Sequence, residues 1–221
     1  MSFFQIKSIK INKNNNSSII ELDTGQKYVI SIDLVVRNKL NKGTKIEKSL
    51  LEKILEEQRI IDAKNIALNL ISYRARTSFQ IEEKLQQKGY TKQEIQKVIQ
   101  FLKEFSYLDD KSFVRNYINF ALGQKKRSRA QIIQELYRKG ISKEDAEEVF
   151  KEIEIENKEL ENAYFLGLKK YKQLSKQNKP NPINRLAQYL YTKGFAWDVI
   201  QKACDKIKTE LNSNENTSTT G

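Results

Sequence analysis

One short motif, L-x-x-K-G, occurs three times in the chain and constrains its fold more than any other feature. The copies end at Gly89, Gly140 and Gly194, so successive glycines lie 51 and 54 residues apart. A fixed period of this length is typical of tandem structural repeats, in which each unit is one small group of secondary-structure elements. We therefore predict three repeated units that together occupy most of the chain.

Apolar residues stand at matching positions around each glycine. Each copy has Leu or Ile eight and four residues before the glycine, and this spacing forms one apolar stripe of a helix. An apolar residue directly follows each glycine, as expected where a helix closes at a left-handed C-terminal glycine. The residues eight before and one after the glycines are Ile81, Ile132, Leu186, Tyr90, Ile141 and Phe195.

Capping residues mark where the helices of each unit begin. Ser78, Ser128 and Asn181 are the expected N-caps of the helices that end at the glycines. Thr91–Glu94 forms a capping box for the following helix, and Ser142–Asp145 is a weaker version of it. Each unit therefore reads as three helices. The first helices are expected over residues 62–73, 111–124 and 158–174.

The chain before the repeats has a β pattern. Three apolar runs separated by turn-forming residues predict a small antiparallel meander. A short helix capped by Ser31 or Asp33 is expected next, ending near Lys42 with Gly43 as its stop. The three runs are Phe3–Ile11, Ser18–Leu22 and Lys27–Ser31.

The predicted fold class is mainly α, with three tandem helix-turn-helix-like repeats in an elongated, curved array that follows the β meander. The N-terminal extension is expected over residues 1–48 and a disordered polar tail over 210–221. The repeats are expected over 49–110, 111–156 and 157–209.

The residue types exclude most catalytic sites. The chain has no histidine and one cysteine, so Ser-His and Cys-His nucleophile pairs and four-cysteine zinc sites are impossible. Neither a GxxxxGK[ST] phosphate loop nor a GxGxxG motif occurs. We expect no enzymatic activity, no cofactor and no metal. Cys204 takes the place of Ile99 and Phe150 in the other repeats, so a core position is expected for it.

No apolar stretch resembles a signal peptide or approaches the ~20 residues of a membrane span. Together with the single cysteine, this favours a cytoplasmic protein. We expect a monomer without membrane contact.

A formal net charge of +12, from 40 Lys and Arg against 28 Asp and Glu, predicts a polyanionic partner. Basic residues gather at a turn of the second repeat, at the equivalent turn of the first, and over 167–193, which contains no acidic residue. Tyrosines near this last stretch are candidates for base stacking, and we favour binding of phosphate or an acidic surface by these clusters; the alternative is a solvated basic face with tyrosines in the core. The candidate binding residues are Arg74, Arg76, Lys125, Lys126, Arg127, Arg129, Arg138, Lys139, Lys169, Lys170, Lys172 and Arg185.

Several stretches of the first and second repeats resemble a known family. Ala67–Ser78, followed by Glu83–Tyr90 and by Tyr107–Phe113, and then Lys126–Ile141, resemble the RecX regulatory proteins. The resemblance covers residues 63–208. It implies a non-enzymatic modulator of the RecA recombinase in recombination, DNA repair and the SOS response.

The resemblance also implies a mechanism. Family members lie in the groove of the RecA filament on single-stranded DNA and inhibit its ATPase and strand exchange. RecA and single-stranded DNA are the implied partners, with double-stranded DNA as a further one. Two alternatives stay open, namely a DNA-binding protein that acts without a recombinase and a helical scaffold for another partner.

Overall fold

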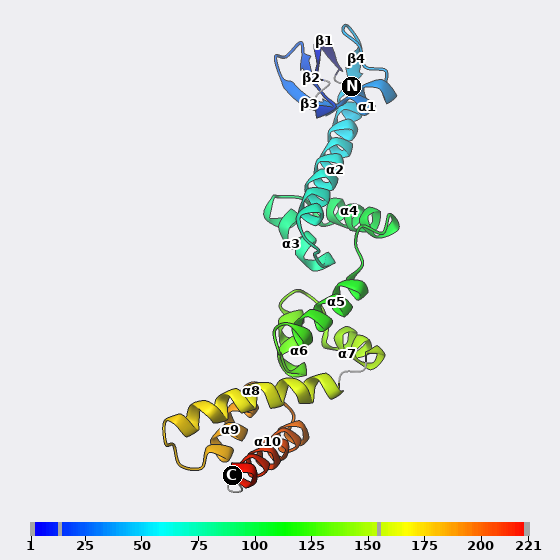
Figure 1. Cartoon of the computed structure of the whole chain (residues 1–221). Coiled ribbons are helices and arrows are strands. Elements are labelled where there is room, and N and C mark those ends of the chain that lie inside the picture. The colour runs from blue at the N-terminus through cyan, green and yellow to red at the C-terminus, as the bar shows by residue number, and fades with distance from the viewer. Residues whose placement is uncertain (1–2, 13–14, 154–155, 219–221) are drawn as a thin grey trace. The chain divides into compact units, whose positions relative to one another are not determined.

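The computed structural model describes residues 3–12, 15–153 and 156–218. Within these residues it has four strands and ten helices (Figure 1). They form two compact units: residues 1–74 with 81–108, and residues 75–80 with 109–221. The mainly helical class with an N-terminal antiparallel sheet is thus confirmed. The elongated, curved array and the five-part division of the chain stay predictions.

The N-terminal sheet has one strand more than expected. Its order is β3-β2-β1-β4, with all neighbours antiparallel. The fourth strand has only three residues, Lys45–Glu47, which is too short to show an alternating pattern in the sequence. The other strands are β1 (Phe3–Asn12), β2 (Ser17–Leu22) and β3 (Lys27–Ser31).

Helix α1 (Ile32–Arg37) follows the sheet and ends earlier than expected. The Ser31 hydroxyl accepts a hydrogen bond from the Leu34 N–H and caps it. The helix ends because Lys39 is left-handed, with φ of 50°. Residue 43, the expected stop, instead lies in the turn before β4.

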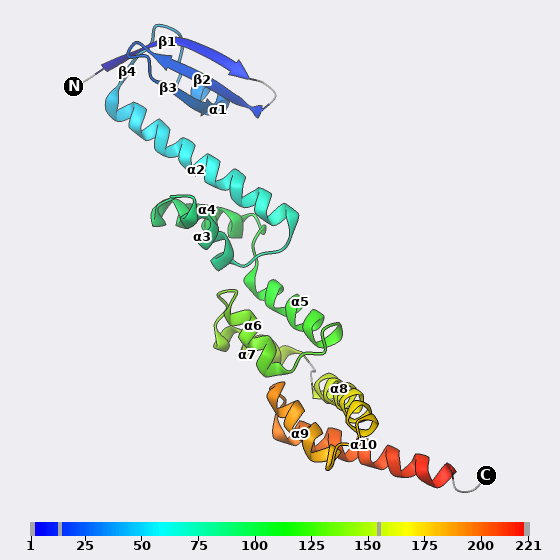
Figure 2. The ribbon, with the colours of Figure 1, turned by 90° about the vertical axis from the view of Figure 1, so that its left-hand side faces the viewer.

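Helix α2 (Lys48–Tyr73) is more than twice as long as the predicted helix at 62–73. Its first half buries Leu51 and Ile54 against the sheet, and its second half buries Ala63 and Ala67 against α3 and α4. Figure 2 shows α2 running from the sheet to α3 and α4. Two separate apolar faces on one helix explain why no single stripe predicted its full length. Helices α3 and α4 are Ser78–Gln87 and Lys92–Glu104.

An ion pair closes the first three-helix group. The Arg59 Nε lies 2.6 Å from Glu94 Oε1, and an Arg59 terminal nitrogen donates to the Gly89 carbonyl at 3.0 Å. Glu94 also completes the predicted capping box with Thr91. The hydrogen bond from Arg59 lowers the pKa of Glu94 to about 2. The Arg59–Glu94 pair therefore joins α2 to the turn at Gly89 and to the start of α4.

The second unit contains two further three-helix groups, each with its own buried core. Cys204 is buried in the second of these cores, as predicted. The helices are α5 (Asp110–Gly123), α6 (Arg129–Tyr137), α7 (Lys143–Glu152), α8 (Glu156–Lys176), α9 (Pro182–Thr192) and α10 (Trp197–Ser218).

The C-terminal tail was expected to be disordered from residue 210, but the structure shows a helix over most of it. Helix α10 continues to Ser218, and Leu211 packs against the last core. Within the sequence Asn212–Ser218 no proline or glycine interrupts the helix. Residues 219–221 lie outside the described part of the chain.

A hydroxyl-to-carbonyl hydrogen bond occurs twice in the second unit at equivalent positions. The Thr77 Oγ1 donates to the Lys139 carbonyl at 2.6 Å, and the Ser128 Oγ donates to the Lys193 carbonyl at 2.7 Å. Both hydroxyls are buried and both also cap a helix, α3 or α6. The lysine carbonyl of an L-x-x-K-G motif is thus held by a helix N-cap.

One predicted N-cap is wrong, and another makes no capping hydrogen bond. Helix α3 begins at Ser78 itself, so the cap is Thr77, the residue that is equivalent to Ser128. The Ser78 N–H donates instead to Asp110. Asn181 is the N-cap of α9 as predicted, with Pro182 after it, but its backbone is left-handed (φ of 50°) and its side chain makes no cap hydrogen bond.

The motif glycines share a left-handed backbone but differ in their surroundings. Their φ angles are 81° at Gly89, 79° at Gly140 and 77° at Gly194. A Cβ on Gly140 would lie 2.2 Å from Phe79, and one on Gly194 would lie 3.1 Å from the Ser128 hydroxyl. A Cβ on Gly89 would meet nothing within 4 Å. The first glycine is needed for its backbone angle alone, and the other two for angle and space.

We predict that Gly140→Ala destabilises the chain more than Gly89→Ala. Each substitution costs about 1–2 kcal/mol for the left-handed backbone, and the clash with Phe79 adds about 1–3 kcal/mol at Gly140. Thermal unfolding of the two variants measures this difference. Adding Phe79→Ala should remove the extra loss in the Gly140 variant. Equal losses for both glycines would contradict this packing.

We also predict an acid-dependent contribution from Glu94. Its folded-state pKa lies below the ordinary value of 4.5, so the stabilisation is complete above pH 4.5 and is lost as the pH falls toward 2. Glu94→Gln should cost on the order of 2 kcal/mol at pH 7 and much less near pH 2, where about half of the Glu94 carboxylates in the folded protein are protonated. Urea unfolding at both pH values measures this. Glu104→Gln on the same helix is the control, and an equal loss at both pH values would contradict the assignment.

Candidate polyanion-binding surfaces

The basic run of the second repeat is residues 125–129, and it lies between α5 and α6, at the predicted helix-to-helix turn. Lys126 takes a left-handed conformation with φ of 54°, and this lets the chain reverse direction. The Arg127 N–H donates to the Ala121 carbonyl at 3.1 Å. The run is therefore fixed by its backbone as well as by its side chains.

Carboxylates of the same repeat neutralise most of this run. Glu135 on α6 lies 3.1 Å from Arg127 Nε and 3.9 Å from Lys125 Nζ. Arg129 pairs with Glu147 on α7, and its guanidinium lies 4.9 Å from the centre of the Phe150 ring. Sequence reasoning missed both glutamates, since only folding brings them to the run.

Tyr117 of α5 lies at the centre of the same cluster. Its hydroxyl donates to Glu135 at 2.5 Å, while the ammonium groups of Lys125 and Lys139 lie 5.4 and 5.3 Å from its ring centre. Burial and the bond to Glu135 raise the pKa of Tyr117 to about 12. Of the five-residue run, only Lys126 among the basic residues has no described carboxylate within ion-pair distance. The cluster is largely built into the fold.

The third repeat presents its cations differently. Lys170 of α8 and Arg185 of α9 line a cavity of about 290 Å³ together with Tyr189. The ammonium groups of Lys170 and Lys193 lie 5.4 and 5.5 Å from the Tyr189 ring centre. In the described part of the chain, none of these three cations forms an ion pair with a carboxylate. The ring supports the ammonium groups here, so the expected base stacking is not favoured at Tyr189.

Arg185 is held in place by a single contact on one side of its guanidinium. Its Nε donates to the Pro180 carbonyl at 3.0 Å. A guanidinium held in this way, with the Lys170 ammonium group lining the same cavity, is suited to a phosphate group. Lys169 and Lys172 of α8 are exposed on the same helix as Lys170.

The remaining candidates are dispersed. Arg74 is exposed at the C-cap of α2, and Arg76 is half-buried and already engaged by other groups. Arg138 is exposed at the end of α6. Lys139 contributes its carbonyl to the bond with Thr77. The structure therefore brings Lys170 and Arg185 together, with Lys193 as an addition.

The described residues offer little for other kinds of site. None of the described helices is long and apolar enough to cross a membrane. Within the same residues no group of three or more Cys, Asp or Glu side chains is placed to hold a metal ion.

Comparison with known proteins covers all three repeats. Residues 63–102 match the RecX first three-helix domain, 109–149 the second and 157–204 the third. The regulatory protein RecX of Clostridioides difficile (strain 630) is 30% identical over 197 residues, which are 88% of this chain and 92% of the relative. RecX of Clostridium botulinum (strain Alaska E43 / Type E3) is 30% identical over 211 residues, covering 94% and 97%.

Solved structures agree on the fold. A crystal structure of regulatory protein RecX superposes with a TM-score of 0.75 at 23% identity, covering 91% of this chain and 99% of that one. RecX from Lactobacillus salivarius gives a TM-score of 0.64 at 26% identity, covering 68% and 97%. The family resemblance seen in the sequence is thereby confirmed, and the chain belongs to the RecX family of regulatory proteins.

Proposed function

We propose that this chain regulates the RecA recombinase by binding the RecA–single-stranded DNA filament and inhibiting its ATPase and strand-exchange activities. Membership of a family of regulatory proteins and the three RecX domains support this. The observation that carries the binding step is the cation cluster of the third repeat, which has no internal counterion in the described structure.

The third repeat is a better candidate for the filament contact than the second, because its cation cluster lacks carboxylate partners in the described structure. Lys125, Arg127 and Arg129 already have carboxylate partners, so a DNA phosphate would have to replace those partners. Cations without a protein partner instead bind a phosphate by releasing solution counterions, which favours association. We therefore take Lys170, Arg185 and Lys193 as the first choice of binding residues.

A second candidate function rests on the same cavity. A concave basic site is suited to DNA phosphate with or without a recombinase, so a DNA-binding protein that acts alone is the alternative. The two differ in their dependence on RecA.

The direct test is ATP hydrolysis by the cognate RecA on single-stranded DNA with this protein titrated in. We expect the rate of ATP hydrolysis to fall at molar ratios well below one protein per RecA subunit. The reason is that one bound regulator blocks a filament of many subunits. Inhibition that begins only when the protein saturates the DNA would favour the alternative. No change in hydrolysis at any ratio would contradict the proposal.

We predict that Lys170→Gln, Arg185→Gln and Lys193→Gln together weaken filament binding at least tenfold. Three lost phosphate contacts should also lower the salt-dependence slope by about 2, at about 0.7 per contact on single strands. Filament binding at several salt concentrations measures both effects.

The matched control removes the same charge from the first three-helix group through Lys88→Gln, Lys92→Gln and Lys103→Gln, all at exposed positions. It should lose much less affinity and keep most of the slope. Equal effects for both triple variants would show that net charge, and not this cavity, governs binding.

A further inference from the structure

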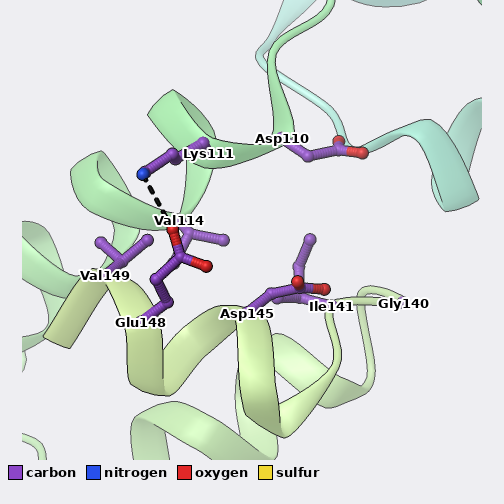
Figure 3. Close-up of a pocket in the computed structure, with 8 residues that line it drawn as sticks. All are labelled: Asp110, Lys111, Val114, Gly140, Ile141, Asp145, Glu148 and Val149. Atoms are coloured by element: carbon purple, nitrogen blue, oxygen red, sulfur yellow. Dashed lines mark hydrogen bonds and ion pairs between the residues drawn. The ribbon is translucent and has the colours of Figure 1, made fainter.

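The first and second repeats carry equivalent pockets with different charges. In the first, Arg59 and Glu94 both line a cavity between α2 and α4 and pair with each other. The equivalent positions, 51 residues later, hold Asp110 and Asp145, which line a cavity of about 260 Å³ between α5 and α7 (Figure 3). The second repeat thus keeps the carboxylate and lacks the arginine.

Two of the acceptor groups that Arg59 uses in the first repeat are unused in the second. Glu94 accepts the Thr91 N–H on Oε2 and receives Arg59 on both oxygens, at 2.6 Å on Oε1 and 3.2 Å on Oε2. Asp145 likewise receives the Ser142 hydroxyl on Oδ2 at 2.6 Å, and no described donor reaches its Oδ1. The Gly89 carbonyl accepts from Arg59, whereas the Gly140 carbonyl, which also lines the pocket, has no donor among the described residues.

The other groups of the pocket are compatible with a planar cation. Glu148 already pairs with Lys111 at 3.0 Å, as the dashed line in Figure 3 shows. Val114, Ile141 and Val149 form the apolar part of the lining. A guanidinium is weakly hydrated and presents a fork of N–H donors, so it tolerates apolar walls better than an ammonium does. The carboxylates are not placed for a metal ion within the described structure.

The third repeat gives an internal comparison. Val199 stands 54 residues after Asp145, at the matching place after its glycine. The third repeat has therefore lost the acceptor itself, and the first pairs it with its own arginine. Among the described residues, the second repeat is the one that keeps this carboxylate without an arginine beside it.

From this juxtaposition we infer that the α5–α7 pocket is a docking site for an arginine side chain of a protein partner. The guanidinium donates to Asp145 Oδ1 and to the Gly140 carbonyl, as Arg59 does to Glu94 and Gly89. Asp110 adds a second carboxylate at the rim, with one oxygen already bound to the Ser78 N–H. This surface is acidic, so its partner differs in charge from the one proposed for the third repeat, and the inference does not depend on RecA.

The test is an NMR titration of the full chain with N-acetyl-arginine amide. We expect saturable shifts of the Gly140, Ile141 and Asp145 amides with a Kd on the order of 1 mM, the range of a few polar contacts. N-acetyl-lysine amide should shift them at least fivefold less. Equal shifts by both compounds, or no shifts, would overturn the inference. Tighter binding of free L-arginine would point to a metabolite site and overturn the protein partner.

Two substitutions in the pocket and one outside it test whether arginine binds at this site or is attracted by negative charge anywhere on the surface. Asp145→Asn keeps the shape and an oxygen for Ser142, and it should weaken arginine binding at least tenfold. Asp110→Arg should abolish binding by pairing with Asp145 from within the chain, as Arg59 does with Glu94. Glu144→Gln on the same helix removes the same charge outside the pocket and should change nothing. A comparable loss in the Glu144 variant would overturn the inference.

Discussion

A buried hydrogen bond from a capping hydroxyl to a lysine carbonyl is the contact on which the helical part of the second unit depends. It occurs at Thr77 with Lys139 and at Ser128 with Lys193. The carbonyl belongs to a turn that contains a left-handed glycine. The same hydroxyl also accepts a hydrogen bond from a backbone N–H in the first turn of a helix and so caps that helix. A single small polar group thus satisfies two buried backbone groups that would otherwise cost about 1–3 kcal/mol each. The bond thus ties the turn of the motif to the helix N-cap that precedes it by one repeat.

The basic residues of the second and third repeats differ in whether they are paired with carboxylates. In the second repeat, arginines and lysines are paired with Glu135 and Glu147 and hold helices together. In the third, a stretch without acids leaves its cations unpaired within the described structure, around one tyrosine. Residues of the same type therefore serve folding in one repeat and are available for a ligand in the next.

Much of the fold was predictable because its signals are local. The left-handed glycines, the Thr91–Glu94 capping box and the first three strands follow from short sequence patterns. The full length of α2 did not, because the helix serves two cores with two faces. Strand β4 did not either, since three residues show no periodicity.

The candidate site was less predictable, for an electrostatic reason. Sequence shows which residues carry charge but not which charges neutralise each other after folding. Arg127 and Glu135 are eight residues apart, and Arg129 and Glu147 are separated by a whole helix. Lys170 reaches Tyr189 only because α8 packs on α9, where Lys193 lies four residues after Tyr189. The family match gave the partner class, while the geometry selected among the basic clusters.

Hydrogen–deuterium exchange of this chain, free and bound to RecA filaments on single-stranded DNA, tests the central claim most directly. The account predicts new protection at the C-terminal end of α8 and along α9, with little change over residues 125–129, whose side chains are already engaged. Protection confined to 125–129, with α8 and α9 unchanged, would contradict it.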